Sequence, residues 1–254
     1  MLKNIIYELL SFILPNTLQN KFGSSKKLRS LRNWLFDRSK VIKPFRRIRW
    51  NGYSFYFHAP LQILTRANYR GIESSLTKAI LSIISENSNV IDIGSNYGFI
   101  TIVSSIYIKN GGIVYSFECE DSIIRNLECS IRKNKLKNIK LFNVTLGDKN
   151  DEKTKTVDSL IFEECDKIDL IKIDTDGTDL ECLKGCSEIL DKFHPVIVIE
   201  INNNLGSIIK YTRLKGYNYF YNQFFSIVDS ESKIDYIPNL ICSKKSLTKP
   251  ILKY

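Results

Sequence analysis

The stretch that decides the fold runs from Asn89 to Thr101 and reads N-V-I-D-I-G-S-N-Y-G-F-I-T. It predicts a short apolar strand, then a turn that contains Gly94 and Gly98, and then an apolar helix. A parallel α/β sheet builds a nucleotide-type site in this way at the carboxyl edge of its first strand. Asn96 stands where a dinucleotide fingerprint has its second glycine, so the turn alone is a weak indication of the ligand.

Asp92, directly in front of this turn, narrows the choice of ligand. A carboxylate beside the turn would repel a pyrophosphate, because like charges at close range destabilise each other. A cofactor that carries positive charge fits better, and S-adenosylmethionine has both a sulfonium and an ammonium group. The acid therefore favours S-adenosylmethionine over NAD.

The central part of the chain alternates apolar strands with helices. Strands are predicted at residues 112–117, 139–145, 168–173 and 195–199, and helical stretches at 69–85, 122–135 and 179–193. This alternation predicts parallel pairing with right-handed crossovers. The strands are rich in Val and Ile, as strands buried on both faces are. The fold class is therefore α/β, a doubly wound Rossmann-like sheet.

Five strands in succession are each closed by an acid. These acids are Asp92, Glu118, Asp148, Asp174 and Glu200. A single acid after a strand is most often a turn former or a helix cap. Five at one sheet edge, where ligands of open α/β sheets bind, repel each other unless a ligand compensates them. The set favours a cationic or polyhydroxyl ligand.

Several motifs in unbroken order carry a family resemblance. They include Y-S-F-E at 115–118, N-V-T-L-G-D at 143–148 and I-D-L-I-K-I-D-T-D-G-T-D-L-E-C-L-K-G at 168–185. From Arg70 to about Asn202 the chain resembles the FkbM-type class I methyltransferases, which depend on S-adenosylmethionine. Asp176 and Asp179 stand where that family commonly has glutamates, a departure that bears on the substrate more than on the chemistry.

The resemblance implies a mostly parallel sheet that ends in an antiparallel hairpin, with strands expected at 217–221 and 239–243. It also implies O-methylation of a hydroxyl on a carbohydrate, a glycan precursor or a secondary metabolite. Two alternatives stay open, an RNA ribose 2′-O-methyltransferase and a non-catalytic binding module. Base N-methylation is disfavoured, because the fourth strand ends in D-T-D-G and not in an N-P-P-Y-like turn.

Roles in cofactor binding follow from the resemblance and the chemistry together. Gly94 and Gly98 let the backbone approach the cofactor, with Asn96 between them. Asp92 is expected to hold the cofactor ammonium, directly or through water, and Glu118 the two ribose hydroxyls. Asp148 is expected to accept from the adenine amine.

The acids beyond the cofactor are candidates for the catalytic base. Asp174 is the first choice, with Asp176 and Glu200 as second choices, because a positioned base typically contributes ~10²–10⁴-fold to the rate. The alternative is that Asp174 only caps a helix or binds the cofactor. A Mg²⁺ site of Asp174, Glu200 and Asn202 is a further alternative. The sequence has no dedicated metal spacing, so no metal is expected.

Two other charged residues, Lys172 and Glu73, are expected near the same edge of the sheet or in its interior. Lys172 lies within the fourth strand, where it should point opposite to its neighbours and needs an acid, either Asp92 or Glu200. Glu73, in Y-R-G-I-E, either reaches the active site or is a helix-start acid favoured by the helix dipole.

The net charge of +10 is confined to the N-terminal fifth of the chain. Residues 1–50 hold 12 Lys and Arg against Glu8 and Asp37, whereas the remainder carries 25 basic and 25 acidic residues. The predicted division is a basic, helical arm at 1–45 and a methyltransferase domain at 46–254. An entry hairpin at 46–57 is predicted from Asn51-Gly52.

The arm itself allows three interpretations, in order of preference a cap over the active site, a peripheral contact with an anionic membrane, and nucleic-acid binding. Its apolar stretch Leu2 to Leu14 is too short to span a bilayer and lacks a signal-peptide cleavage pattern. None of the six cysteines forms a C-x-x-C pair. A cytoplasmic protein with reduced thiols is therefore expected, with membrane association through the arm left open. The sequence does not specify the acceptor or the oligomeric state.

Overall fold

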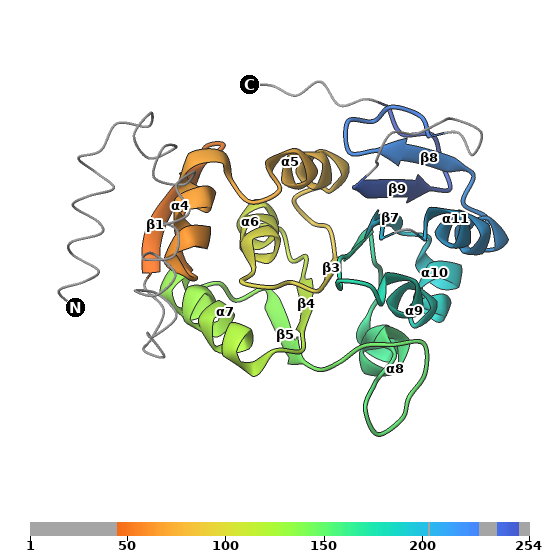
Figure 1. Ribbon diagram of the computed structural model, residues 1–254, viewed down its shortest axis with the longest axis horizontal. Helices are drawn as coiled ribbons and strands as arrows, with labels where there is room; N and C mark the ends of the chain where they lie inside the picture. The colour runs from red at the N-terminus through yellow and green to blue at the C-terminus, as the bar shows by residue number, and fades with distance from the viewer. Residues whose placement is uncertain (1–44, 203, 229–237, 249–254) are drawn as a thin grey trace, which may run out of the picture.

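The computed structural model describes residues 45–202, 204–228 and 238–248, and the predicted arm up to residue 44 lies outside these ranges. Its centre is a seven-stranded sheet with the order β5-β4-β3-β6-β7-β9-β8 (Figure 1). The strands of the sheet are β3 Val90–Ile93, β4 Val114–Glu118, β5 Ile139–Asn143, β6 Leu170–Ile173, β7 Val196–Glu200, β8 Tyr219–Asn222 and β9 Asn239–Ser243.

The first five of these strands are parallel, and β9 runs antiparallel to both β7 and β8. The order reverses between β4 and β6, on the two sides of β3. In such a sheet the ligand site lies outside the carboxyl ends of the strands at the point of reversal. The mostly parallel sheet with its C-terminal antiparallel hairpin confirms the predicted fold class.

Helices cover both faces of the sheet (Figure 1). Their bounds are α4 Leu61–Arg70, α5 Ser74–Ile83, α6 Phe99–Tyr107, α7 Asp121–Asn134, α8 Val157–Ile161, α9 Asp179–Lys184, α10 Ser187–Phe193 and α11 Leu205–Leu214, with a 3₁₀ turn at Phe162–Glu164. Residues of α8 to α11 belong to the apolar core on one face, and residues of α5 to α7 to the core on the other. Two covered faces explain why the central strands are apolar on both sides.

Two of the predicted helices are each divided in the structure. The helix expected over 69–85 is replaced by the end of α4 and by α5, separated at Gly71. A Cβ at Gly71 would lie 2.2 Å from the indole nitrogen of Trp50. The helix expected over 179–193 is α9 and α10, separated near Gly185, where a Cβ would lie 2.2 Å from the carbonyl oxygen of Gly147. Tertiary contacts set both breaks.

A two-stranded hairpin precedes the sheet. It consists of β1 Phe45–Trp50 and β2 Tyr53–His58, paired antiparallel around Asn51 and Gly52. Both turn residues have positive φ, 48° and 81°, as a two-residue turn of type I′ requires. The hairpin is fixed to α7 by hydrogen bonds such as the one from the Tyr56 backbone N–H to Asn134 Oδ1 at 2.8 Å. Its Phe57 thereby reaches the site described below.

One further property of the helices bears on the membrane question. In the ranges that the structure describes, we find no helix with the length and apolar character needed to cross a membrane.

Candidate functional site

A cavity of about 550 Å³ opens at the carboxyl ends of β3, β4, β6 and β7. Its walls include the glycine turn after β3, Glu118 at the end of β4, and the acids that follow β6 and β7. Phe57 of the hairpin and Glu73 in front of α5 also line the cavity. The volume lies within the range of cofactor and small-molecule sites.

The glycine turn has the conformation that the sequence predicts. Gly94 and Gly98 have φ values of 69° and 82°, and Asn96 between them has a φ of 51°. A Cβ at Gly94 would lie 1.8 Å from the backbone oxygen of Asp174, and a Cβ at Gly98 would lie 2.2 Å from Leu127 Cδ1. Gly94 thus brings the ends of β3 and β6 together, and Gly98 lets α6 pack on α7.

Glu118 is held in place by the backbone around it. Its Oε2 accepts a hydrogen bond from the Asn96 N–H at 2.8 Å, and its Oε1 accepts from the N–H groups of Cys119 at 2.9 Å and Glu120 at 3.0 Å. A carboxylate offers about four acceptor positions, so these bonds leave capacity for a ligand hydroxyl. The side chain is oriented before any ligand binds.

Ser95, within the same turn, was not singled out by the sequence reasoning. It is 6% exposed and lines the cavity, and its hydroxyl has no hydrogen-bond partner among the described residues. A buried hydroxyl without a partner loses the hydrogen bonds it would make in water, which a bound ligand would restore. Ser95 therefore fits a cofactor bound against this turn.

Asp92 lies beneath the turn and does not line the cavity. It is 1% exposed, accepts a hydrogen bond from Thr101 Oγ1 and lies 3.4 Å from the ammonium of Lys172. Asp92 and Lys172 are directly paired in register on β3 and β6, which confirms the acid expected for that lysine. The predicted contact of Asp92 with the cofactor ammonium stays a prediction.

The ammonium of Lys172 lies close to a backbone carbonyl group and to two carboxylates. It donates to the carbonyl oxygen of Gly94 at 3.0 Å and lies 3.5 Å from Asp174 Oδ2, in addition to Asp92. Burial lowers the pKa of Lys172, but the two carboxylates outweigh this effect and raise it above the ordinary value. Lys172 is therefore a permanent positive charge between the glycine turn and Asp174.

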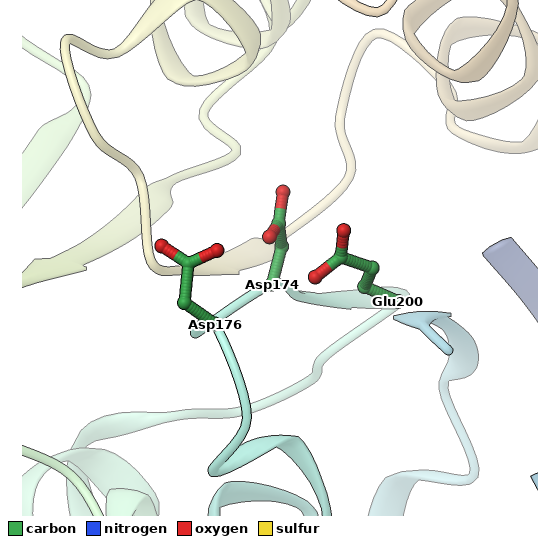
Figure 2. Close-up of side chains that lie close together, drawn as sticks. All are labelled: Asp174, Asp176 and Glu200. Carbon is green, nitrogen blue, oxygen red and sulfur yellow. The ribbon is translucent and has the colours of Figure 1, made fainter. Parts of the chain in front are cut away.

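Three carboxyl groups meet at the far side of the turn. Figure 2 shows Asp174 at the end of β6, Asp176 in the loop that follows and Glu200 at the end of β7, with their side chains extending side by side. One carboxylate oxygen from each lies within 4.8 Å of the others. Hard oxygen ligands suit divalent cations, but this cluster differs from the Mg²⁺ set expected from the sequence, because it contains Asp176 in place of Asn202. The Lys172 ammonium also lies against Asp174.

The environment of Glu200 shifts its pKa. Burial raises the pKa of its carboxyl group, and the negative charge of Asp174 adds to the rise. The amide of Asn202 opposes it by donating to Glu200 Oε2 at 2.8 Å. A carboxylate with a raised pKa binds a proton more strongly, which is the property that a general base needs.

Asp179 supports the loop that carries Asp174 and Asp176. It is fully buried, and its carboxylate accepts from the N–H groups of Thr175 at 2.8 Å and Gly177 at 3.3 Å. The Asn202 amide also donates to it, at 3.2 Å, and so connects it with Glu200. Asp179 and Asn202 thus orient the acids, a role that sequence spacing does not reveal.

Asp148 is placed differently from the other predicted residues. It is exposed and absent from the cavity wall, where Val144, Thr145 and Leu146 lie instead. The strand β5 ends at Asn143, two residues earlier than predicted, so the chain has left the sheet edge before it reaches Asp148. Its contact with adenine stays a prediction without support from the geometry.

Comparison with known proteins agrees with the motifs. The model of the Methyltransferase FkbM domain matches residues 151–219, which include β6, β7 and all three clustered acids. A search of curated proteins gave no match.

Solved structures with a similar fold include an FkbM methyltransferase from Methylobacillus flagellatus KT, with 16% identity and a TM-score of 0.49. That match covers 63% of this chain and 44% of the other, so this chain spans less than half of that protein. A fibrillarin from Aeropyrum pernix in complex with S-adenosyl-L-methionine has 14% identity and a TM-score of 0.49, with 81% and 84% of the two chains covered. At these values the likeness concerns the fold and says nothing of the acceptor.

The matched segment carries the predicted K-I-D-T-D-G-T-D motif, and the sheet around it ends in the predicted antiparallel hairpin. Residues 151–219 are thus similar to the methyltransferase FkbM domain, the family that the sequence motifs predict.

Proposed function

We propose that the protein methylates a hydroxyl group of a small carbohydrate, a glycan precursor or a secondary metabolite. The observation that carries this proposal is the group formed by Asp174, Asp176 and Glu200, whose carboxylate oxygens lie within 4.8 Å of one another beside the glycine turn. An alcohol is a weak nucleophile until its proton is drawn off, and a carboxylate at hydrogen-bond distance does this.

The cofactor would lie along the turn. Gly94 and Gly98 line this part of the cavity, the Ser95 hydroxyl supplies an unused hydrogen bond, and Glu118 offers its remaining acceptor positions to the ribose. When bound, S-adenosylmethionine supplies an electrophilic methyl group. Its positive charge suits a cavity lined by six acidic and only two basic residues.

The proton of the acceptor hydroxyl would pass to the pair formed by Asp174 and Glu200. Asp174 follows β6 beside the turn, and the ammonium of Lys172 lies 3.5 Å from it. Burial raises the pKa of Glu200, which strengthens its hold on a proton. Glu200 therefore suits proton acceptance, and Asp174 would hold the hydroxyl in line with the methyl group.

The charge of the cavity favours a neutral acceptor over a nucleic acid. A phosphate backbone binds proteins through Lys and Arg, whereas acids outnumber the cations Arg66 and Lys172 on this wall. Lys172 is moreover occupied by Asp92 and Asp174. A polyhydroxyl acceptor donates hydrogen bonds to carboxylates and meets no such repulsion.

Calorimetric titration with S-adenosylmethionine and S-adenosylhomocysteine, with NAD as control, tests the cofactor. Micromolar binding is expected for the wild type, with a loss of at least tenfold in Glu118→Ala. Transfer of radiolabelled methyl groups to a panel of nucleotide sugars, oligosaccharides and total RNA then tests the acceptor class. Labelling of RNA alone would refute the proposal that the acceptor is a small molecule. Absence of cofactor binding in folded protein would refute the proposal that the protein is a methyltransferase.

A further inference from the structure

Glu73 occupies a position that its role as a helix-start residue does not explain. It is the N-cap of α5, yet its side chain makes no capping hydrogen bond. Within the described residues the carboxyl group has neither a hydrogen bond nor an ion pair. It lines the same cavity as the acids that follow β6 and β7.

The backbone at Glu73 is also unfavourable for its residue type. Its φ of 46° and ψ of 47° place it in the left-handed region, which glycine and asparagine adopt more readily than glutamate. Conformations of this kind cost of order 1 kcal/mol and persist where the surroundings impose them, often at ligand sites. The strain would be relieved by Gly or Asn without loss of any visible contact.

The electrostatic surroundings of Glu73 are those of the reacting centre. Burial raises the pKa of its carboxyl group, the charge of Lys172 opposes the rise, and the charges of Asp174 and Asp92 add to it. The same ammonium and carboxylates surround the end of β6. Glu73 thus adds an acid to the cavity wall from a separate segment of the chain.

We propose that Glu73 is an acceptor-binding residue. Its carboxyl group accepts a hydrogen bond from a hydroxyl group of the acceptor, and this hydroxyl is adjacent to the one that is methylated. The inference rests on the proposed function, because it takes the space between Glu73 and Asp174 as the acceptor subsite. A polyol held by carboxyl groups from two separate segments of the chain has its reacting oxygen fixed in direction as well as in distance, which an in-line displacement requires.

A test that does not need the natural acceptor uses two cofactor analogues. S-adenosylhomocysteine has nothing in the place of the transferred methyl group, whereas sinefungin carries an amine there that points toward the acceptor subsite. The ratio of their dissociation constants, measured by calorimetry, reports the charge that faces the transferred group. In Glu73→Gln the affinity for sinefungin should fall about tenfold, because a charged hydrogen-bond acceptor is removed. The affinity for S-adenosylhomocysteine should stay within twofold of wild type.

Two further variants separate this role from a structural one. Glu73→Asn should show the same change in the ratio together with an unchanged or higher melting temperature, because Asn adopts the left-handed conformation more easily. Glu188→Gln, at an exposed acid in the first turn of α10, is the matched control and should change neither quantity.

The outcomes are distinct. A ratio within twofold of wild type in Glu73→Gln, with S-adenosylhomocysteine still bound, would overturn the role of Glu73 and leave the methyltransferase proposal intact. Failure of wild type to bind S-adenosylhomocysteine would overturn the proposed function, and the acceptor subsite with it. Once an acceptor is found, Glu73→Gln should raise its KM and leave the KM for S-adenosylmethionine unchanged.

Discussion

The buried ion pair between Lys172 and Asp92 offers a sharp test of how the site is built. Their side chains are 4% and 1% exposed, and the ammonium lies 3.4 Å from Asp92 Oδ1. Lys172→Met keeps most of the side-chain length and removes the charge. Asp92 is then left with one hydrogen bond, from Thr101. Removing one partner of a buried pair costs ~3–5 kcal/mol, because the other charge stays buried without compensation.

The expected pattern in a double-mutant cycle follows from the same geometry. At 3.4 Å, the attraction of the two charges is about 5 kcal/mol for an effective dielectric constant of about 20, most of which is offset by the cost of removing them from water. Asp92→Asn alone should cost about 1–3 kcal/mol, since Lys172 keeps Asp174 and the Gly94 carbonyl. The double variant should also cost about 1–3 kcal/mol, because neither charge is then left alone.

Urea unfolding followed by fluorescence measures these differences, provided that the slope with denaturant stays constant across the variants. A coupling energy of at least ~2 kcal/mol is expected between the two positions. Lys210→Met, at an exposed position on α11, is the control and should stay within about 0.5 kcal/mol of wild type. If the changes in the free energy of unfolding of the two single variants sum to that of the double variant within about 0.5 kcal/mol, the pairing and the reasoning from strand register are refuted.

Three other predictions concern the turn, the metal alternative and an exposed loop. Gly94→Ala should destabilise the fold by at least ~2 kcal/mol in urea unfolding, because the new Cβ meets a backbone oxygen at 1.8 Å; a stable variant with intact cofactor binding would contradict this. Dialysis against EDTA should leave methyl transfer unchanged, and a loss restored by Mg²⁺ would instead favour the metal site. Hydrogen bonds from the N–H groups of Thr154 and Lys153 lower the pKa of Asp151 to about 2. Its stabilising contribution is thus present above its ordinary pKa of 3.8 and lost as the pH falls toward 2, which carbon NMR titration of the carboxyl group checks.

The parallel strands were predictable because each is a short apolar run followed by a polar residue. β9 has its predicted bounds, and β4, β6 and β7 lie within two residues of the prediction at either end. The helix breaks at Gly71 and Gly185 were not predictable, because they depend on Trp50 and Gly147, which are distant in sequence. The helices α4, α8 and α11 were not predicted, and the five-residue α8 is too short to form without packing against its neighbours.

At the site, too, some roles were predictable from the local sequence, whereas others depend on contacts between residues that are distant in sequence. The acid for Lys172 was predictable, because strand alternation puts the side chain in the interior, where a charge needs a partner. The roles of Ser95, Asp179 and Asn202 depend on contacts between loops that meet only in the folded sheet. Glu73 was open to both interpretations in the sequence, because the missing capping bond is visible only in the structure.

The position of Lys172 connects the stability of the sheet with the geometry of methyl transfer. Because β3 and β6 are neighbours, the glycine turn and Asp174 emerge side by side, and one ammonium reaches the Gly94 carbonyl at 3.0 Å and Asp174 at 3.5 Å. The same side chain therefore fixes the segment that would hold the methyl donor and the acid that would hold the acceptor. A displacement of about 1 Å between reacting groups can cost 10²-fold in rate. Double substitution of Asp92 and Lys172 should thus recover much of the stability lost in Lys172→Met without recovering methyl transfer, since no neutral side chain restores the bridge from Gly94 to Asp174.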